Sequence, residues 1–164
     1  MRTGLAVGSA LDREAARTLG RELRRAEALG VALRALGHRD LSRRKLEERL
    51  SRRGTRVDAQ AEVLGALERV GLVDDGRVAS ARAQALAGRG YGDAAVRFAL
   101  EGEGLAPELV AAALAGLEPE AVRARTLLGR RGGGPAAARW LAARGFGAAT
   151  LEDVVGFADE AWPR

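Results

Sequence analysis

Cationic side chains spaced three and four residues apart form the most pronounced chemical pattern in this sequence. If residues 42–53 form a helix, Lys45, Arg49 and Arg52 fall in one narrow stripe, because each residue advances the helix by about 100°. Such a stripe suits the phosphates of a nucleic acid or an acidic groove on a protein. Its charge continues in four neighbouring arginines: Arg43, Arg44, Arg53 and Arg56.

The same segment also allows a plainer interpretation. Arg43 and Glu47 are four residues apart, as are Arg44 and Glu48, and Glu48 and Arg52. Pairs at this spacing form ion pairs on the solvated face of a helix. The sequence therefore leaves open whether this basic helix binds a partner or only faces solvent.

Two glycine-rich segments, residues 89–92 and 130–134, carry arginines that could hold an anion. Neither segment matches a P-loop or a dinucleotide-binding fingerprint, and neither follows a predicted strand, so a flexible connector is the favoured interpretation. Arg130 and Arg131 remain candidate binding residues because of their charge.

Tyr91 is a candidate for exposed stacking, whereas Trp140 and two phenylalanines are expected to pack in the core: Phe146 and Phe157.

Residues that could perform catalysis are scarce. Asp74 and Asp75 could hold a metal or act as acid and base, but adjacent carboxylates at a helix start are typical of a cap. His38 is the sole histidine, cysteine is absent, and no nucleophile, base and oxyanion donor come together. We therefore predict a protein that is not an enzyme and that has no metal and no cofactor.

The elements that must position these residues are predicted to be helices. Alanine, leucine, arginine and glutamate dominate, and all four favour helix. Residues 11–36 form one helix, or two if Gly20 and Gly30 interrupt it. Asp40 or Ser42 is expected to cap a helix that runs to Arg53, and Asp58 is expected to cap the next helix. A further helix begins at Asp74–Asp75, and four of its side chains are expected to face the core: Val78, Ala81, Ala85 and Leu86. Five more helices start near residues 93, 107, 119, 136 and 150.

One register recurs three times, aligned on Gly54, Gly104 and Gly145. A leucine stands four residues before each glycine, and an apolar residue stands ten residues after: Leu50, Leu100 and Leu141, then Leu64, Leu114 and Val155. Repeats of this length indicate one supersecondary unit used several times, and such arrays usually present a surface to a partner. We predict an elongated all-α array of three three-helix units over residues 26–72, 73–117 and 118–164, after an N-terminal helical extension over residues 1–25.

Charge is distributed unevenly along the chain. Residues 1–56 carry a balance of +8, residues 57–120 a balance of −6 and residues 121–164 a balance of +3. Such polarised fields steer association with charged partners. The sequence contains no run of 18 apolar residues, the length that would indicate a membrane-spanning helix. Asp12, Arg13 and Glu14 cut short the apolar run at the start, which argues against a signal peptide. We therefore expect a cytoplasmic protein that does not bind membranes.

Several segments resemble the RecX family of RecA regulators over residues 26–160. Residues 67–79 look like the family signature L-x-x-x-G-L-L-D-D-x-R-F-A, and residues 33–50 resemble the family's opening helix pattern. Residues 90–92 look like its K-G-Y-G loop, and residues 144–146 resemble its third-unit turn. The signature residues are expected to be structural: Gly71, Leu72, Asp74, Asp75, Arg77, Gly90, Tyr91, Gly92, Gly145 and Phe146.

Three positions depart from the family pattern. Val78 replaces an aromatic residue, and Lys45 replaces the glutamate that would complete a capping box with Ser42. Thr55 replaces the phenylalanine that usually follows Gly54. We expect the first unit to pack less tightly and to be more basic than the family pattern.

The resemblance implies a monomer that binds along the groove of the RecA nucleoprotein filament. There it would restrain RecA's ATPase, strand exchange and co-protease activity in DNA repair, by bridging RecA protomers. On this interpretation nine cations are the candidate contacts to RecA or to single- or double-stranded DNA: Arg43, Arg44, Lys45, Arg49, Arg52, Arg53, Arg56, Arg130 and Arg131. The alternative is a helical DNA-binding module that acts without RecA, or an adaptor for another acidic partner.

Overall fold

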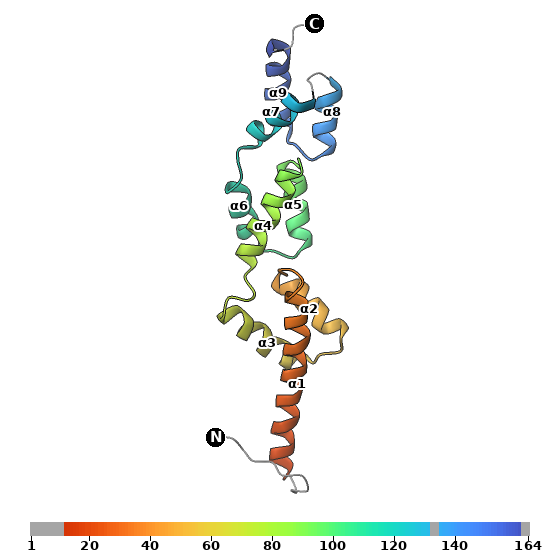
Figure 1. Cartoon of the computed structure of the whole chain (residues 1–164), viewed down its shortest axis with the longest axis vertical. Coiled ribbons are helices and arrows are strands. Elements are labelled where there is room, and N and C mark those ends of the chain that lie inside the picture. Colours follow the sequence, from red (N-terminus) through yellow and green to blue (C-terminus); the bar gives the residue numbers. More distant parts are fainter. Residues whose placement is uncertain (1–11, 132–134, 162–164) are drawn as a thin grey trace. The chain divides into compact units, whose positions relative to one another are not determined.

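A computed structural model describes residues 12–131 and 135–161, with side chains omitted at 131, 135 and 155–161. These residues form helices joined by short connections, which confirms the all-α class (Figure 1). The helices are α1 Arg13–Leu36, α2 Arg43–Arg52, α3 Val57–Arg69, α4 Asp75–Gly88, α5 Asp93–Gly102, α6 Pro107–Ala115, α7 Glu120–Arg131, α8 Pro135–Ala143 and α9 Ala148–Ala161.

The chain divides into two compact units. The first comprises Met1–Leu41 and Leu46–Val73, and the second comprises Ser42–Lys45 and Asp74–Arg164, so the first residues of α2 belong to the second unit. The division into three three-helix units stays a prediction.

Within the first unit, α1 packs against α3, and the buried leucines of α2 belong to the same apolar cluster. The buried face of α1 consists of alanines, Ala28, Ala32 and Ala35, which let the neighbouring backbone approach closely. Helix α1 is continuous across Gly20 and Gly30, and the predicted boundary at residue 25 falls inside it. Asp12 caps its start by accepting the Ala15 N–H over 2.7 Å.

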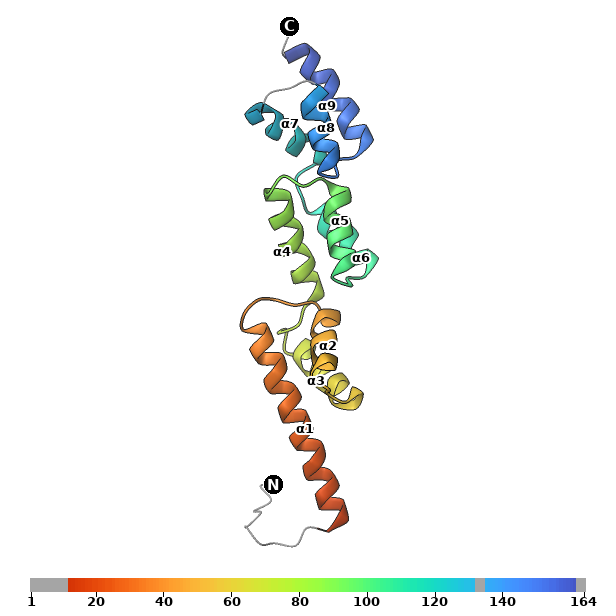
Figure 2. The same ribbon diagram turned by 90° about the vertical axis from the view of Figure 1, so that its right-hand side faces the viewer.

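The second unit contains two apolar clusters. Helices α4, α5 and α6 pack on one another around Val96, Leu100 and Val110, and α5 and α6 lie side by side in Figure 2. Helices α7, α8 and α9 pack around Leu141 and Val154. Pro107 begins α6 at a position where its missing N–H costs no helical hydrogen bond.

The register glycines end three helices in the same geometry. Gly54, Gly104 and Gly145 have φ angles of 72°, 76° and 80°, a region that favours glycine because it has no Cβ. The residue after each glycine donates its N–H to the leucine carbonyl five residues earlier, over 3.1, 3.4 and 3.2 Å. This is a Schellman motif, and the leucines, Leu50, Leu100 and Leu141, are fully buried.

The residue that follows the register glycine packs differently in the three turns. Leu105 and Phe146 are each 5% exposed, whereas Thr55 is only half-buried. Ten residues after the glycine, Leu64 is buried and Leu114 half-buried, and the Val155 side chain lies outside the described residues. At the position directly after the glycine, the apolar repeat is therefore weakest in the Gly54 turn, whereas ten residues further on it is fully buried there.

Two local predictions are wrong. Asp58 does not cap α3, because the helix begins at Val57 and its cap residue is Arg56. On α4, Ala81 and Ala85 are exposed, while Ala79 and Ala83 take the inward positions between Val78 and the half-buried Leu86. The inward face follows the four-residue step from Ala79 to Ala83, and position 81 lies well around the helix from it.

Candidate partner-binding surface

Helix α2 turns its cations outward because its leucines are held inside. Ser42 lies at its start and its Oγ accepts the Lys45 N–H over 3.2 Å. Leu46 and Leu50 are fully buried, and the turn at Gly54 ends the helix. With one face fixed in this way, the opposite face of the helix must be turned toward solvent.

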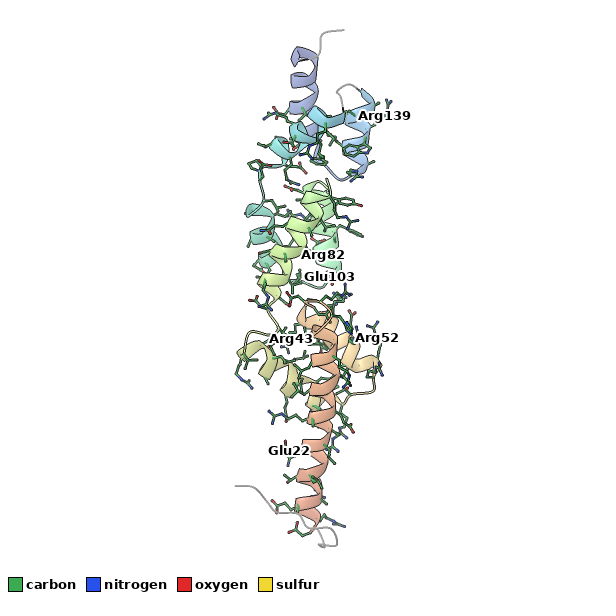
Figure 3. The ribbon with its side chains drawn as sticks, in the orientation of Figure 1. Glu22, Arg43, Arg52, Arg82, Glu103 and Arg139 are labelled. Atoms are coloured by element: carbon green, nitrogen blue, oxygen red, sulfur yellow. The ribbon has the colours of Figure 1, made fainter. Side chains whose placement is uncertain are left out.

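The structure exposes most of the predicted binding residues but not the whole stripe. Arg49 and Arg52 are exposed, and Arg52 points away from α2 in Figure 3. Lys45, the third member, is half-buried, as is Arg43. Four more candidates are exposed: Arg44, Arg53, Arg56 and Arg130. The Arg131 side chain lies outside the described residues.

Arg44 is held against a turn of the second unit. A Cβ placed on Gly104 would lie 2.0 Å from the Arg44 Cδ, so the aliphatic part of Arg44 covers this glycine. Nearby, Arg82 and Glu103 approach to 3.8 Å. Both side chains are labelled in Figure 3. Arg44 therefore contributes packing as well as charge.

The paired aspartates of the signature act as caps. Asp74 accepts the Arg77 N–H over 2.9 Å and lies 3.7 Å from the Arg77 guanidinium. Asp75 Oδ1 accepts the backbone N–H of Arg43, the first residue of α2, over 2.7 Å. Gly71 ends α3 with a φ of 72°, and Leu72 is exposed. The signature thus spans the end of α3 and the start of α4, and both carboxylates are engaged by backbone N–H groups.

Residues around Asp75 form a contact that we call the Asp75 junction: Ser42, Arg43, Asp75 and Glu103. All four belong to the second unit. Besides the Asp75 bond, the Ser42 Oγ donates to the Glu103 carbonyl over 2.7 Å. The start of α2 is thereby held by a carboxylate and by the end of α5.

A second contact repeats this pattern, and we call it the Glu120 junction: Gly92, Asp93, Glu120 and Arg144. Glu120 Oε1 accepts the N–H of Asp93, the first residue of α5, over 2.6 Å. The Gly92 N–H donates to the Arg144 carbonyl over 2.9 Å. A Cβ at Gly92 would lie 2.4 Å from the Gly145 backbone, so only glycine fits here.

A buried arginine completes the Glu120 junction. Arg123 is 8% exposed and donates to the carbonyls of Glu118 and Tyr91, each over 2.9 Å, and to the Asp93 carboxylate. Its guanidinium also lies 5.9 Å from the Phe146 ring centroid. The junction thus gives the Gly92 and Phe146 positions of the signature a structural role.

Tyr91 stacks with arginines of its own chain. Its ring lies 5.6 Å from the Arg89 guanidinium and 5.2 Å from that of Arg144, which also lies 4.6 Å from the Trp140 ring. Arg144 Nη1 donates to the Arg89 carbonyl over 2.8 Å. Gly90 is buried beneath Leu127, so the 89–92 segment is packed rather than open for an anion.

Sequence reasoning missed three residues that matter to these sites. Glu120 and Arg123 were not singled out, although Glu120 begins α7 as Asp75 begins α4. Arg24 of α1 shares a pocket with Arg53 and Arg56, and no sequence signal predicts which part of α1 meets that turn.

Among the described residues, no three His, Cys, Asp or Glu side chains gather as metal ligands. His38 is exposed after the end of α1. Over the same residues, no helix is both long and apolar enough to cross a membrane.

The recurring glycine-ended helices and carboxylate-capped junctions define an all-α protein built from a repeated helical motif, with arginines over its exposed faces. No protein-family model matches the chain. It is, however, 36% identical over 145 residues to Regulatory protein RecX of Xanthomonas oryzae pv. oryzae (strain MAFF 311018), covering 82% of this chain and 91% of that protein. The chain belongs to the RecX family of regulatory proteins.

One further relative and two solved structures are also similar to this chain. Regulatory protein RecX of Deinococcus radiodurans is 31% identical over 87% of this chain and 74% of its own length. A crystal structure of regulatory protein RecX matches with a TM-score of 0.76 at 19% identity, covering 92% of this chain and 82% of that one. RecX from Lactobacillus salivarius matches with a TM-score of 0.73 at 16% identity, covering 84% and 97%. These structures share the fold.

Proposed function

We propose that this protein binds RecA–DNA filaments and modulates, mainly by inhibition, the ATPase, strand exchange and co-protease activities of RecA in recombinational DNA repair. The observation that carries the proposal is membership of the RecX family over most of the chain. We further propose that it acts without catalysis, as a cytoplasmic monomer.

Exposed charge supports this role physically. A RecA–DNA filament presents phosphates, and Arg49, Arg52 and Arg53 form an exposed basic group near the end of α2. The segment that carries them has a balance of +8, whereas residues 57–120 have a balance of −6. Attraction between the basic segment and the phosphates speeds association, and the uneven distribution of charge along the chain orients the partner.

Purified protein added to RecA on single-stranded DNA tests the proposal. At stoichiometric amounts we expect RecA's DNA-dependent ATPase and strand exchange to fall, and the protein to sediment with the filaments in a salt-dependent manner. Unchanged ATPase and strand exchange, with no co-sedimentation at low salt, would contradict it.

The exposed arginines of α2 also favour a second candidate, a DNA-binding module that acts without RecA. The variant Arg49→Glu/Arg52→Glu separates the two. Loss of DNA binding with intact RecA inhibition places this helix on DNA, whereas loss of RecA inhibition with intact DNA binding places it on RecA. Charge reversal at exposed Glu101 and Glu108 of the second unit is the matched control, and an equal effect there would overturn the assignment to α2.

A further inference from the structure

A pocket of about 280 Å³ opens in the first unit between α1 and the turn that joins α2 to α3. Helix α1 supplies Arg24 and Glu27, and the turn supplies residues 53–56, including Arg53 and Arg56. Three arginines from two parts of the chain, α1 and the α2–α3 turn, therefore line one cavity, and Glu27 is the single acidic residue among its lining residues. Neither the family signature nor the junctions use this pocket.

The turn that lines the pocket is braced from inside the unit. Gln60 is only 5% exposed, and its Nε2 donates to the Thr55 carbonyl over 2.6 Å. The Ser51 Oγ donates to the Gln60 Oε1 over 3.2 Å, and Gly54 closes the end of α2. The buried Gln60 side chain thus holds the turn at the Thr55 carbonyl, so the next residue, Arg56, is carried on backbone that is ordered before a ligand binds.

The pocket lies at the N-terminus of α3, where backbone N–H groups give a partial positive charge. Arg56 occupies the cap position, and its Nε donates to Asp58 Oδ1 over 3.3 Å. The pKa of Asp58 is lowered, first by the Ala59 N–H and then by Arg56 and Arg24. Among these causes the charge of Arg24, on α1, is the smallest.

The chemistry of the surroundings decides between possible anions. No Phe, Trp or Tyr precedes Tyr91 in the sequence, and His38, the imidazole of the first unit, does not line the pocket. The pocket therefore has no ring on which an unpaired base could stack and no Trp or Tyr to anchor a protein interface. Guanidinium groups match the oxygen geometry of a phosphate and contact a nucleic-acid backbone without regard to its sequence.

We propose that this pocket binds a backbone phosphate of duplex DNA through Arg24, Arg53 and Arg56. The inference deepens the function proposed above, because it names the DNA of the filament as the ligand of this pocket and α1 as part of the DNA-binding surface.

The test compares Arg24→Gln with Arg25→Gln. Arg25 is the adjacent exposed arginine of α1, which lies 4.0 Å from Glu22 and does not line the pocket. For Arg24→Gln we expect duplex binding, measured by fluorescence anisotropy, to weaken about tenfold at low salt, and the slope of log affinity against log salt to fall by about 0.9, one phosphate contact. For Arg25→Gln we expect less than about a twofold change and an unaltered slope. Equal effects of the two substitutions would overturn the proposal.

A second measurement does not depend on a variant folding. Inorganic phosphate added to the isotopically labelled wild-type protein should shift the backbone amide NMR signals of Gly54, Thr55 and Arg56 before those of Gly102 and Gly116 in the second unit. Uniform small shifts throughout the chain would count against the pocket.

RecA assays keep this inference distinct from the proposed function. If wild-type protein inhibits RecA but Arg24→Gln binds duplex as Arg25→Gln does, the pocket fails and the function stands. If Arg24→Gln lowers duplex affinity but wild-type protein leaves RecA's ATPase unchanged, the pocket stands and the function fails. If Arg24→Gln weakens RecA inhibition and leaves duplex binding intact, the ligand is a protein carboxylate and the phosphate proposal is wrong.

Discussion

The Asp75 junction and the Glu120 junction place a carboxylate at the same structural position but differ in how closely their backbones approach. At the Asp75 junction, the Ser42 hydroxyl reaches the Glu103 carbonyl. At the Glu120 junction, the residue in the same register is Gly92, and its own N–H donates to the Arg144 carbonyl. A side chain spans the first contact, whereas the second has no room for one.

A further difference lies three residues into the following helix. Val78 in α4 and Arg123 in α7 hold corresponding positions, and each is 8% exposed. Valine adds apolar burial, while Arg123 binds two carbonyls and the Asp93 carboxylate. The same helical geometry is therefore stabilised by apolar packing in one place and by a buried polar network in the other, and the polar network should depend more strongly on each of its members.

Gly92→Ala should have the largest effect. The added Cβ would meet the backbone of Gly145 and Phe146 at 2.4 Å, which cannot move aside as a side chain can. We expect the free energy of unfolding in urea, followed by circular dichroism, to fall by about 3 kcal/mol. Gly102→Ala, at the end of α5 with no atom within 4 Å of its Cβ, is the control and should change little. Equal stabilities of the two variants would show that the junction backbones do not touch.

Arg123→Val replaces the polar residue of the Glu120 junction with its counterpart from the Asp75 junction. It leaves the Tyr91 carbonyl and Asp93 without their donor, and we expect a loss of about 2 kcal/mol in the same urea experiment. Adding Asp93→Asn should cost less in this background than in wild type, with a coupling of about 1 kcal/mol. Strict additivity would mean that the ion pair contributes nothing.

Removing the carboxylate of each junction should show which junction contributes more to the free energy of unfolding. Glu120 accepts from the Asp93 and Gly147 N–H groups and from the Thr150 Oγ1, whereas Asp75 accepts from the Arg43 N–H. We expect Glu120→Ala to lower the free energy of unfolding by about 2 kcal/mol and Asp75→Ala by about 1 kcal/mol. The exposed Glu118 serves as a control through Glu118→Ala. The reverse ranking would contradict a stronger Glu120 junction.

Ser42→Ala should have an effect as small as that of Asp75→Ala. It removes the bond to the Glu103 carbonyl and the cap on the Lys45 N–H, both made by one hydroxyl. We expect a loss of about 1 kcal/mol, measured by thermal unfolding, and a faster hydrogen exchange at the Lys45 amide. If that exchange is unchanged, the hydroxyl does not cap α2 in solution.

Features governed by a few neighbouring residues could be predicted from the sequence. The register glycines end helices because a positive φ is a local requirement, and Asp74 caps α4 through the N–H three residues later. The cap assigned to Asp58 was wrong because Arg56 and Val57 already start the helix. It was harder to predict which side chains of a helix face the core: Ala81 and Ala85 were expected to face inward but are exposed.

Features created by packing could not be predicted. Arg123 looks like any surface arginine in the sequence, and its burial depends on carbonyls contributed by residues 91 and 118. Arg24 joins Arg53 and Arg56 only because α1 runs past the α2–α3 turn. The predicted contacts on α2 were mostly found exposed, since two buried leucines fix its orientation, yet which of those cations binds a partner stays a prediction.

The long helix α1 has two unequal halves. From Arg13 to Glu27 its side chains are exposed or half-buried, and full burial begins only at Ala28. An isolated helix of that length is marginal in water. We expect the amides of residues 13–27 to exchange with solvent faster than those of residues 28–36. Arg24 lies in the half of α1 whose amides exchange faster, so an anion bound at Arg24 would slow amide exchange over several turns of the helix. Binding at the pocket would then be detectable as increased order in α1.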